Sequence, residues 1–172
     1  MGTMLYALEV PNPGGDTLFA DMYRAYDTLS NGMKRLLNGV TGLYSSAQNN
    51  IGGRAEKMKE LAGMKTAFVR EAEPIEAFHP VIRTHPETGK KALYVNFSHT
   101  VHFEGMTREE TLPILEYLTR HAVKPEFTCR VRWRKGDLVF WDNRCVQHKA
   151  INDYNGQRRR MHRVTLKGDK PF

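Results

Sequence analysis

The sequence predicts a mainly β protein in which helices flank an antiparallel sheet or barrel. Helical patterns concentrate in the first third of the 172 residues, and strand patterns dominate the last third. Strands and helices do not alternate regularly, as they do in parallel-sheet proteins. Hydrophobic residues make up 40% of the chain and charged residues 26%, which is the composition of a globular protein and not of a disordered segment.

The length predicts a single domain, 1–172, because it supports a hydrophobic core but is too short for two ordinary domains. No apolar stretch reaches the roughly eighteen residues of a membrane span, and residues 1–10 lack the features of a signal peptide. Cys129 and Cys145 form no CxxC pair, which favours free thiols in a reducing cytoplasm. The formal charge of +7 favours anionic partners, either small molecules or nucleic acid.

The first predicted elements are a strand and two helical segments. Residues 4–10 are strand-like and end in the turn-rich run 11–16. Apolar residues then recur at helical spacing at Leu18, Met22, Tyr26 and Leu29. Ser30 is a candidate N-cap for a second short helix. We interpret the apolar residues of both helical segments as core contacts.

The middle of the chain contains an irregular segment and a predicted hairpin. Residues 44–76 mix Ser, Asn, Gln and Gly-Gly with alternating Lys and Glu, and they carry only a weak helical stripe. Two interpretations fit this composition, a mobile lid over a site and a plain surface insertion. Residues 78–84 and 91–97 flank the Pro- and Gly-containing run 85–90, which predicts a β-hairpin.

A helix and a strand are predicted next. Thr107 and Glu110 have the spacing of a capping box, and the apolar face that follows predicts a helix to about His121. Residues 127–133 alternate apolar and polar side chains, as a half-buried strand does.

Two more predicted strands, 138–141 and 161–166, bracket the most informative residues of the chain. A turn after the first strand leads to His148, and Arg159 and Arg163 follow it at +11 and +15. One imidazole and two guanidiniums suit a site that holds a metal ion and two anions. Arginine is suited to the anions because its planar fork grips a carboxylate or sulfonate with two nitrogens and stays charged at any working pH.

The alternation of a strand predicts where Arg163 points. If its segment is extended, Met161 and Arg163 share one face, while His162 and Val164 share the other. Arg163 can then point toward the same region as Arg159, which lies near the entrance of the strand.

Several short motifs occur in order along essentially the whole chain, from about Leu5 to Phe172. They are Gly14-Gly15-Asp16-Thr17-Leu18, His85-Pro86, Trp141-Asp142-Asn143-Arg144, Gln147-His148, Asn152-Asp153-Tyr154, Arg159-Arg160-Met161-His162-Arg163 and Gly168-Asp169-Lys170-Pro171. With these motifs the chain resembles the taurine/2,4-dichlorophenoxyacetate dioxygenase family. The family consists of non-haem Fe(II) enzymes that use 2-oxoglutarate and dioxygen on a double-stranded β-helix, the jelly-roll-like barrel of the cupin type.

The resemblance implies a role for each of five residues. His148 would be the distal iron ligand, since a neutral imidazole suits this metal. Arg159 would pair with the C5 carboxylate of 2-oxoglutarate, and Thr17 would donate a hydroxyl hydrogen bond to the same carboxylate. Trp141 would line the cofactor pocket, and Arg163 would face the acidic group of the substrate. The expected cofactors are therefore Fe(II) and 2-oxoglutarate, and the expected partners are dioxygen and a small anionic substrate.

One part of the family pattern is missing from its expected place. In the family, two His and one carboxylate hold the iron, and the His-x-Asp pair lies on a strand before the Gly-Gly-Asp-Thr turn. Because Thr17 is only 16 residues from Met1, we expect that strand to be absent and the barrel to be incomplete on its N-terminal side. His102-Phe103-Glu104, with His99 nearby, is a literal substitute. It follows the turn instead of preceding it, so we interpret it as a surface or strand-edge histidine pair.

The resemblance implies hydroxylation of a sulfonate, a sulfate ester or an aryloxy acid beside its heteroatom, with release of succinate and CO2. Two alternatives stay open. A truncated, catalytically inactive remnant or partner subunit would bind anions only, and the exposed sheet edges of a half-barrel would favour a homo-oligomer. A basic nucleic-acid-binding protein would use the arginines at 158–160 and 163, although the sequence has no recognisable nucleic-acid-binding module.

Overall fold

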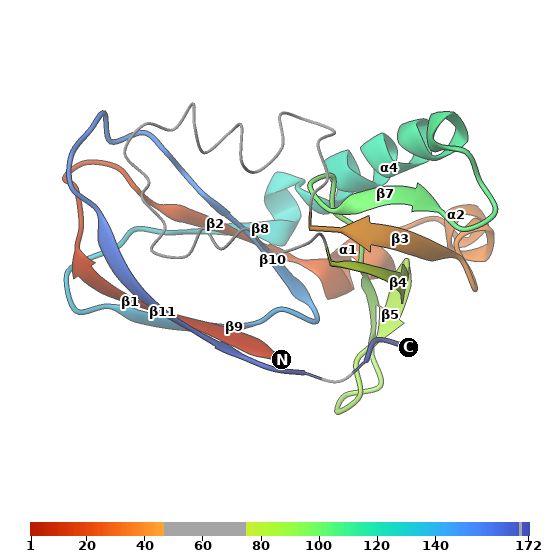
Figure 1. Ribbon diagram of the computed structural model, residues 1–172, viewed down its shortest axis with the longest axis horizontal. Helices are drawn as coiled ribbons and strands as arrows, with labels where there is room; N and C mark the ends of the chain where they lie inside the picture. The colour runs from red at the N-terminus through yellow and green to blue at the C-terminus, as the bar shows by residue number, and fades with distance from the viewer. Residues whose placement is uncertain (47–74, 169) are drawn as a thin grey trace.

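The computed structural model describes residues 1–46, 75–168 and 170–172 (Figure 1). Its strands are β1 (Gly2–Glu9), β2 (Thr17–Asp21), β3 (Thr41–Ser45), β4 (Glu76–Pro80), β5 (Ile82–Thr84), β6 (Lys91–Leu93), β7 (Thr100–Phe103), β8 (Thr128–Val131), β9 (Leu138–Asp142), β10 (Val146–Ala150) and β11 (Arg160–Leu166). Its helices are α1 (Met22–Asp27), α2 (Asn31–Leu36), α4 (Arg108–Ala122) and the 3-10 helix η1 (Pro125–Phe127).

Two three-stranded antiparallel sheets face each other at one end of the molecule (Figure 1). The β1 sheet has the order β11-β1-β9, and the β2 sheet has the order β10-β2-β8. Trp141 on β9 contacts Phe19 on β2 with ring centroids 5.1 Å apart, so the sheets pack through the faces that carry these rings. Within the described ranges the two sheets share no strand and do not close into a barrel. The predicted fold class is confirmed: the protein is mainly β with flanking helices, and its double-stranded β-helix is open and incomplete.

The strand register gives the β1 sheet an inner and an outer face. Leu5 on β1 pairs with Val139 on β9 and with Arg163 on β11, so these three side chains lie on the same side. Thr3 and Trp141 lie on this inner face too, and they are only 2% and 6% exposed because the β2 sheet covers them. The intervening residues form the outer face. The predicted alternation around Arg163 is therefore confirmed.

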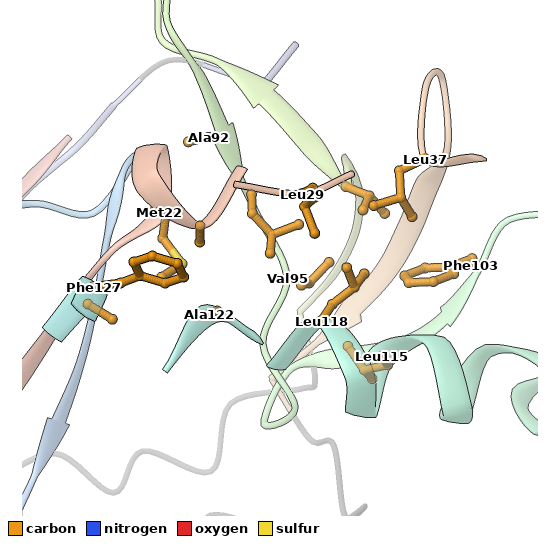
Figure 2. Close-up of a cluster of buried hydrophobic side chains, with 14 residues drawn as sticks. Met22, Leu29, Leu37, Ala92, Val95, Phe103, Leu115, Leu118, Ala122 and Phe127 are labelled. Carbon is orange, nitrogen blue, oxygen red and sulfur yellow. The ribbon is translucent and has the colours of Figure 1, made fainter. Parts of the chain in front are cut away.

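The main hydrophobic core lies at the other end of the molecule, between α1, α4 and the strands beneath them (Figure 2). The strands come from the β4-β3-β7 sheet and the β5-β6 hairpin. Phe103 and Leu118 are fully buried in this core. Helix α4 begins at the predicted capping box, in which the Thr107 hydroxyl accepts from the Glu110 backbone and the Glu110 carboxylate accepts from the Thr107 backbone. Among the helices of the described ranges, none has the length and apolarity that crossing a membrane requires.

One sequence prediction about a single residue is wrong. Leu18 lies in β2, and helix α1 begins only at Met22, after the N-cap Asp21. Leu18 adopts a strand despite its helical spacing because β2 is hydrogen-bonded on both sides, to β8 and to β10. The predicted turn after β9 is confirmed at residues 143–145, and it leads to His148, which pairs with Phe19 inside β10. The prediction that Ser30 caps a second helix is confirmed, since its hydroxyl accepts from the backbone of Met33.

The predicted hairpin is confirmed in a shorter form. Strands β5 and β6 pair around the turn at 85–90, whereas β4 pairs with β3, so residues 78–84 do not form one continuous strand. Most of the predicted lid at 44–76 lies outside the described residues. At its two ends, Tyr44 belongs to β3 and Glu76 begins β4.

Candidate functional site

The candidate site lies between the inner faces of the β1 and β2 sheets. Phe19 and His148 are cross-strand neighbours on the β2 sheet, and Trp141 reaches them from the β1 sheet. The ring centroids of Trp141 and His148 are 4.8 Å apart, and those of Phe19 and His148 are 6.2 Å apart. The imidazole of His148 therefore rests against an aromatic wall on one side, while the residue as a whole stays exposed.

The orientation of Trp141 is set by hydrogen bonds to its neighbours. Its indole Nε1 donates to Oδ1 of Asn143 at 2.9 Å, and Nδ2 of Asn143 donates to Oγ1 of Thr3 at 2.8 Å. Because Thr3 lies on β1, the turn that follows Trp141 is tied to the centre of its own sheet. This bonding holds the ring in place over His148.

A buried ionic network fixes the turn between β9 and β10. Arg144 donates to Asp142 through Nε and Nη2 at 2.9 and 2.6 Å, and its Nη1 lies 2.8 Å from Glu87 on the β5-β6 hairpin. Burial opposes ionisation of Asp142, but hydrogen bonds from Arg144 and His85 outweigh burial and hold the pKa of this carboxyl well below its usual range. The network therefore joins the turn before His148 to a hairpin far away in the sequence.

The tautomer of His85 follows from its hydrogen-bond partners. Its Nδ1 lies 3.2 and 3.3 Å from the backbone nitrogens of Glu87 and Thr88, which only donate. An accepting Nδ1 leaves the ring proton on Nε2, and Nε2 donates to Asp142 at 3.1 Å. His85 is therefore a neutral structural donor in this network.

Thr17 carries a buried hydroxyl at the start of β2. It is 1% exposed, and its Oγ1 accepts from the indole Nε1 of Trp133 at 3.0 Å. A hydroxyl that accepts this bond keeps its own proton for another partner. The donor role that the resemblance assigns to Thr17 is thus compatible with its surroundings.

Arg159 reaches the same end of the site and is held by Gly15, two residues before Thr17. Its Nε donates to the Gly15 carbonyl at 2.9 Å. Its Nη2 is buried and has no hydrogen-bond partner among the described residues. Burial lowers the pKa of Arg159 below its ordinary value, with nearby Tyr154 and Asp16 acting in the opposite direction. A half-buried guanidinium with an unpaired nitrogen is suited to binding an anion.

The close approach of Arg159 requires a glycine at position 15. Gly15 has a φ of +72°, and a Cβ there would lie 2.9 Å from Cδ of Arg159. Its amide is held by Oδ1 of Asp153 at 2.7 Å. The Gly-Gly turn therefore positions the guanidinium through backbone contacts.

Arg163 lies on the inner face, farther along β11. It is exposed, and its Nε lies 3.3 Å from Oγ1 of Thr165. No carboxylate lies within ion-pair distance of its guanidinium among the described residues, so an incoming anion has access to it.

The described residues do not complete an iron site around His148. Within them, the one group of three close metal-ligand side chains is His85, Asp142 and Cys145, and it does not include His148. Its carboxylate is already neutralised by Arg144, which a cation would have to displace.

The substitute His102-Phe103-Glu104 lies in and beyond β7, outside the two facing sheets. Nδ1 of His102 lies near the Phe103 carbonyl, that of His99 near the Ser45 carbonyl, and Glu104 accepts a hydrogen bond from Thr41. These contacts agree with the interpretation of a strand-edge histidine pair.

Comparison with known proteins identifies the family. Residues 1–165 match the family described as taurine catabolism dioxygenase TauD, TfdA family. The chain belongs to this family. An alkylsulfatase of Acinetobacter baylyi is 34% identical over 171 residues, which cover 97% of this chain and 52% of the relative. An alpha-ketoglutarate-dependent 2,4-dichlorophenoxyacetate dioxygenase of Burkholderia sp. (strain RASC) is 36% identical over 167 residues, covering 96% of this chain and 53% of the relative.

Two solved structures are similar to this fold. A taurine dioxygenase from Burkholderia xenovorans has a TM-score of 0.78 and 32% sequence identity, covering 99% of this chain and 53% of that chain. A crystal structure of AAD-2 in complex with Mn(II) and N-oxalylglycine has a TM-score of 0.81 and 29% identity, covering 99% and 64% of the two chains. The chain thus spans about half the length of the curated relatives it matches.

Two parts of the site were not predicted from the sequence. The role of Trp133 was missed, although its position in the alternating run 127–133 predicts that it points the same way as Cys129. The motifs that contain His85 and Asp142 were recognised, but they are 57 residues apart and no local pattern indicates that they form a hydrogen bond.

Proposed function

We propose that residues 1–172 form the 2-oxoglutarate-binding and substrate-binding part of an Fe(II)-dependent dioxygenase. The overall reaction consumes 2-oxoglutarate, dioxygen and a substrate C–H bond, and it yields succinate, CO2 and a hydroxylated carbon beside the substrate heteroatom. The observation that carries this proposal is the unpaired, buried Nη2 of Arg159, whose Nε is held by the carbonyl of Gly15, two residues before Thr17. Membership of the family and the names of its relatives support the reaction class.

The C5 carboxylate of 2-oxoglutarate fits the donors present. Arg159 supplies a fixed positive charge and a free N–H, and Thr17 supplies a neutral O–H. The ring of Trp141 supplies an apolar wall of the cofactor pocket. Water exclusion strengthens the interaction between the guanidinium and the carboxylate.

The described residues supply only part of the expected metal site. His148 supplies one imidazole nitrogen, whereas the family site needs two further ligands that the described residues do not place beside it. The described residues therefore do not hold Fe(II) on their own. We assign His148 as one of its ligands.

We assign the recognition of a small anionic substrate to Arg163. Its position on the inner face lets it meet the acidic group of a molecule lying between the sheets. A guanidinium can bind a sulfonate, a sulfate ester or a carboxylate equally well, because each of these groups accepts two of its N–H hydrogen bonds.

Calorimetric titration with N-oxalylglycine tests the cofactor site without turnover. Arg159→Ala should weaken binding by tenfold or more, about 1.4 kcal/mol, because it removes a charge-assisted hydrogen bond. Arg158→Ala is the matched control, since Arg158 is 74% exposed and pairs with Glu9 instead. Equal affinities of the wild type and Arg159→Ala would refute the assignment.

The substrate site is tested by titrating 2,4-dichlorophenoxyacetate, an alkyl sulfate and taurine in the presence of N-oxalylglycine. Arg163→Gln should weaken whichever of these ligands binds. Arg160→Gln should leave that affinity unchanged, because Arg160 lies near Glu9 with its side chain 62% exposed. A ligand that binds equally well to Arg163→Gln would contradict the role of Arg163.

A second candidate function is an anion-binding subunit without catalysis of its own. It is favoured by the one group of three close metal-ligand side chains among the described residues, His85, Asp142 and Cys145, because this group leaves out His148. Under this function N-oxalylglycine binds as above, but Fe(II) and 2-oxoglutarate give no visible charge-transfer band under anaerobic conditions. Appearance of that band would rule it out.

A further inference from the structure

Arg83 is a buried guanidinium that has no counter-ion among the described residues. Its side chain is 1% exposed, and its Nε and Nη1 are buried atoms without a hydrogen-bond partner in those ranges. No carboxylate of the described ranges lies within ion-pair distance of it. Because an unpaired buried charge is costly, folded proteins neutralise such a group with an acceptor or an anion.

The other buried arginine of the described residues shows how this fold neutralises a guanidinium. Arg144 is 8% exposed, and its nitrogens lie 2.6 Å from Asp142 and 2.8 Å from Glu87. Arg83 is buried more deeply and has no such partner in the described ranges. Compared with Arg144, its surroundings therefore lack negative charge.

The position of Arg83 in its sheet directs the side chain inward. Arg83 lies on β5 opposite Ala92 on β6, and the small side chain of Ala92 leaves room for the long one. Ala92 and the nearby Val81 are at most 1% exposed. Cζ of Arg83 lies 5.1 Å from the centroid of the Tyr94 ring. This cation–π contact offsets part of the cost of burial, but the ring carries no formal negative charge.

The side chains around Arg83 add positive charge and another unpaired nitrogen. His79 packs edge-on against the Tyr94 ring with centroids 5.9 Å apart, and its Nδ1 is buried without a partner in the described ranges. Burial lowers the pKa of His79, and the nearby charges of Arg83 and Lys170 lower it further. Tyr44 packs against the other rings, and its hydroxyl donates to the Tyr94 carbonyl. We call these five residues the Arg83 cluster.

We infer that the Arg83 cluster is a second anion site of this protein and binds one small oxyanion, such as sulfate, phosphate or a free carboxylate. The guanidinium provides charge-assisted hydrogen bonds, and Nδ1 of His79 can donate another in the tautomer that carries its proton there. Lys170 is exposed, so it places a cation beside the cluster on the solvent side. The cluster lies outside the two facing sheets, and this inference does not rest on the proposed function.

The first test follows His79 by NMR while sodium sulfate is added to the wild-type chain. Sulfate keeps its charge over the working pH range, so the titration of the ligand does not interfere. Bound sulfate should raise the pKa of His79, because the anion offsets the charges of Arg83 and Lys170. This readout is local, so sulfate bound at Arg159 does not mimic it. An equal pKa of His79 in sulfate and in chloride of the same ionic strength overturns the inference.

The second test compares the thermal stability of Arg83→Met with that of the wild type. Sulfate stabilises most proteins because it is excluded from their surface, and this effect is common to both proteins. Binding at Arg83 adds a further rise in the Tm of the wild type, about 3 °C at ten times the Kd. Arg35→Met is the matched control, because Arg35 is exposed, and it should respond as the wild type does. Equal responses of the wild type and Arg83→Met overturn the inference.

A third comparison separates a free anion from a carboxylate of the chain itself. Asp169 stands next to Lys170 in the sequence and is the nearest such candidate. A free-anion site predicts that sulfate raises the pKa of His79 in the wild type and in Asp169→Asn alike. If sulfate acts on Asp169→Asn and not on the wild type, the charge comes from the chain and the inference is overturned.

Discussion

The indole nitrogen of Trp133 donates to the hydroxyl oxygen of Thr17 across 3.0 Å, and both side chains are almost fully buried. This bond orients the hydroxyl so that its proton is left for a ligand. Thr17→Val removes that proton, and N-oxalylglycine affinity should fall by about tenfold, the usual effect of losing one hydrogen bond to a charged group. Trp133→Phe leaves the hydroxyl free to rotate and should cause a smaller loss. Calorimetric titration measures both, and a Thr17→Val affinity equal to that of the wild type contradicts the role.

Gly15→Ala should impair both stability and anion binding. The new Cβ would lie 2.9 Å from Cδ of Arg159, and the residue has a φ of +72°. Gly39→Ala is a matched control, because Gly39 has a φ of +76° but no heavy atom lies within 4 Å of the position of its Cβ. Both variants should lose about 1–2 kcal/mol of stability from the left-handed backbone. Only Gly15→Ala should lose N-oxalylglycine affinity, so equal affinities of the two variants would argue against the positioning of Arg159 by this turn.

Asp142→Asn should destabilise the fold by roughly 3 kcal/mol at neutral pH, because it leaves the buried guanidinium of Arg144 with only the exposed carboxylate of Glu87 as a partner. The folded-state pKa of Asp142 lies below its ordinary value of 3.8, so its contribution is fully present above that pH and is lost as the pH falls further. Urea unfolding at pH 7 and pH 3 should therefore show a smaller difference between wild type and variant in acid. Asp27→Asn, at an exposed position, is the control and should have little effect at either pH.

Residues in local patterns were predicted well, and residues placed by distant partners were not. The capping box at Thr107 and the alternation around Arg163 depend on spacings of a few residues, which the sequence displays directly. Leu18 was predicted as helical from the spacing of the apolar residues around it. It lies in a strand because β8 and β10, more than a hundred residues later in the chain, pair with that strand. His148 was predicted from its motif, but its strand β10 depends on the same pairing with β2. Long-range hydrogen bonding leaves no periodic signal in a single segment.

Lowering the pH should also destabilise the fold through His79. Burial, together with Arg83 and Lys170, lowers the pKa of His79 below 6.5. The unfolded chain therefore takes up a proton near pH 6.5 while the folded chain stays neutral to lower pH, so this residue destabilises the fold as the pH falls from 7.5 to 5.5. His79→Phe keeps a ring against Tyr44 and Tyr94 and should flatten the decrease in Tm over that range. Parallel Tm profiles of the two proteins would contradict this prediction.

Strand β1 is the first element of the chain and yet the middle strand of its sheet. Gly2 pairs with Leu166 on one side and with Asp142 on the other. During synthesis, one edge of β1 has no partner until β9 is made, and the other edge has none until β11 is made, more than 150 residues after β1. Contacts so distant in sequence form slowly. In the interval β1 presents an unpaired strand edge, a feature of the intermediates that chaperones protect from aggregation.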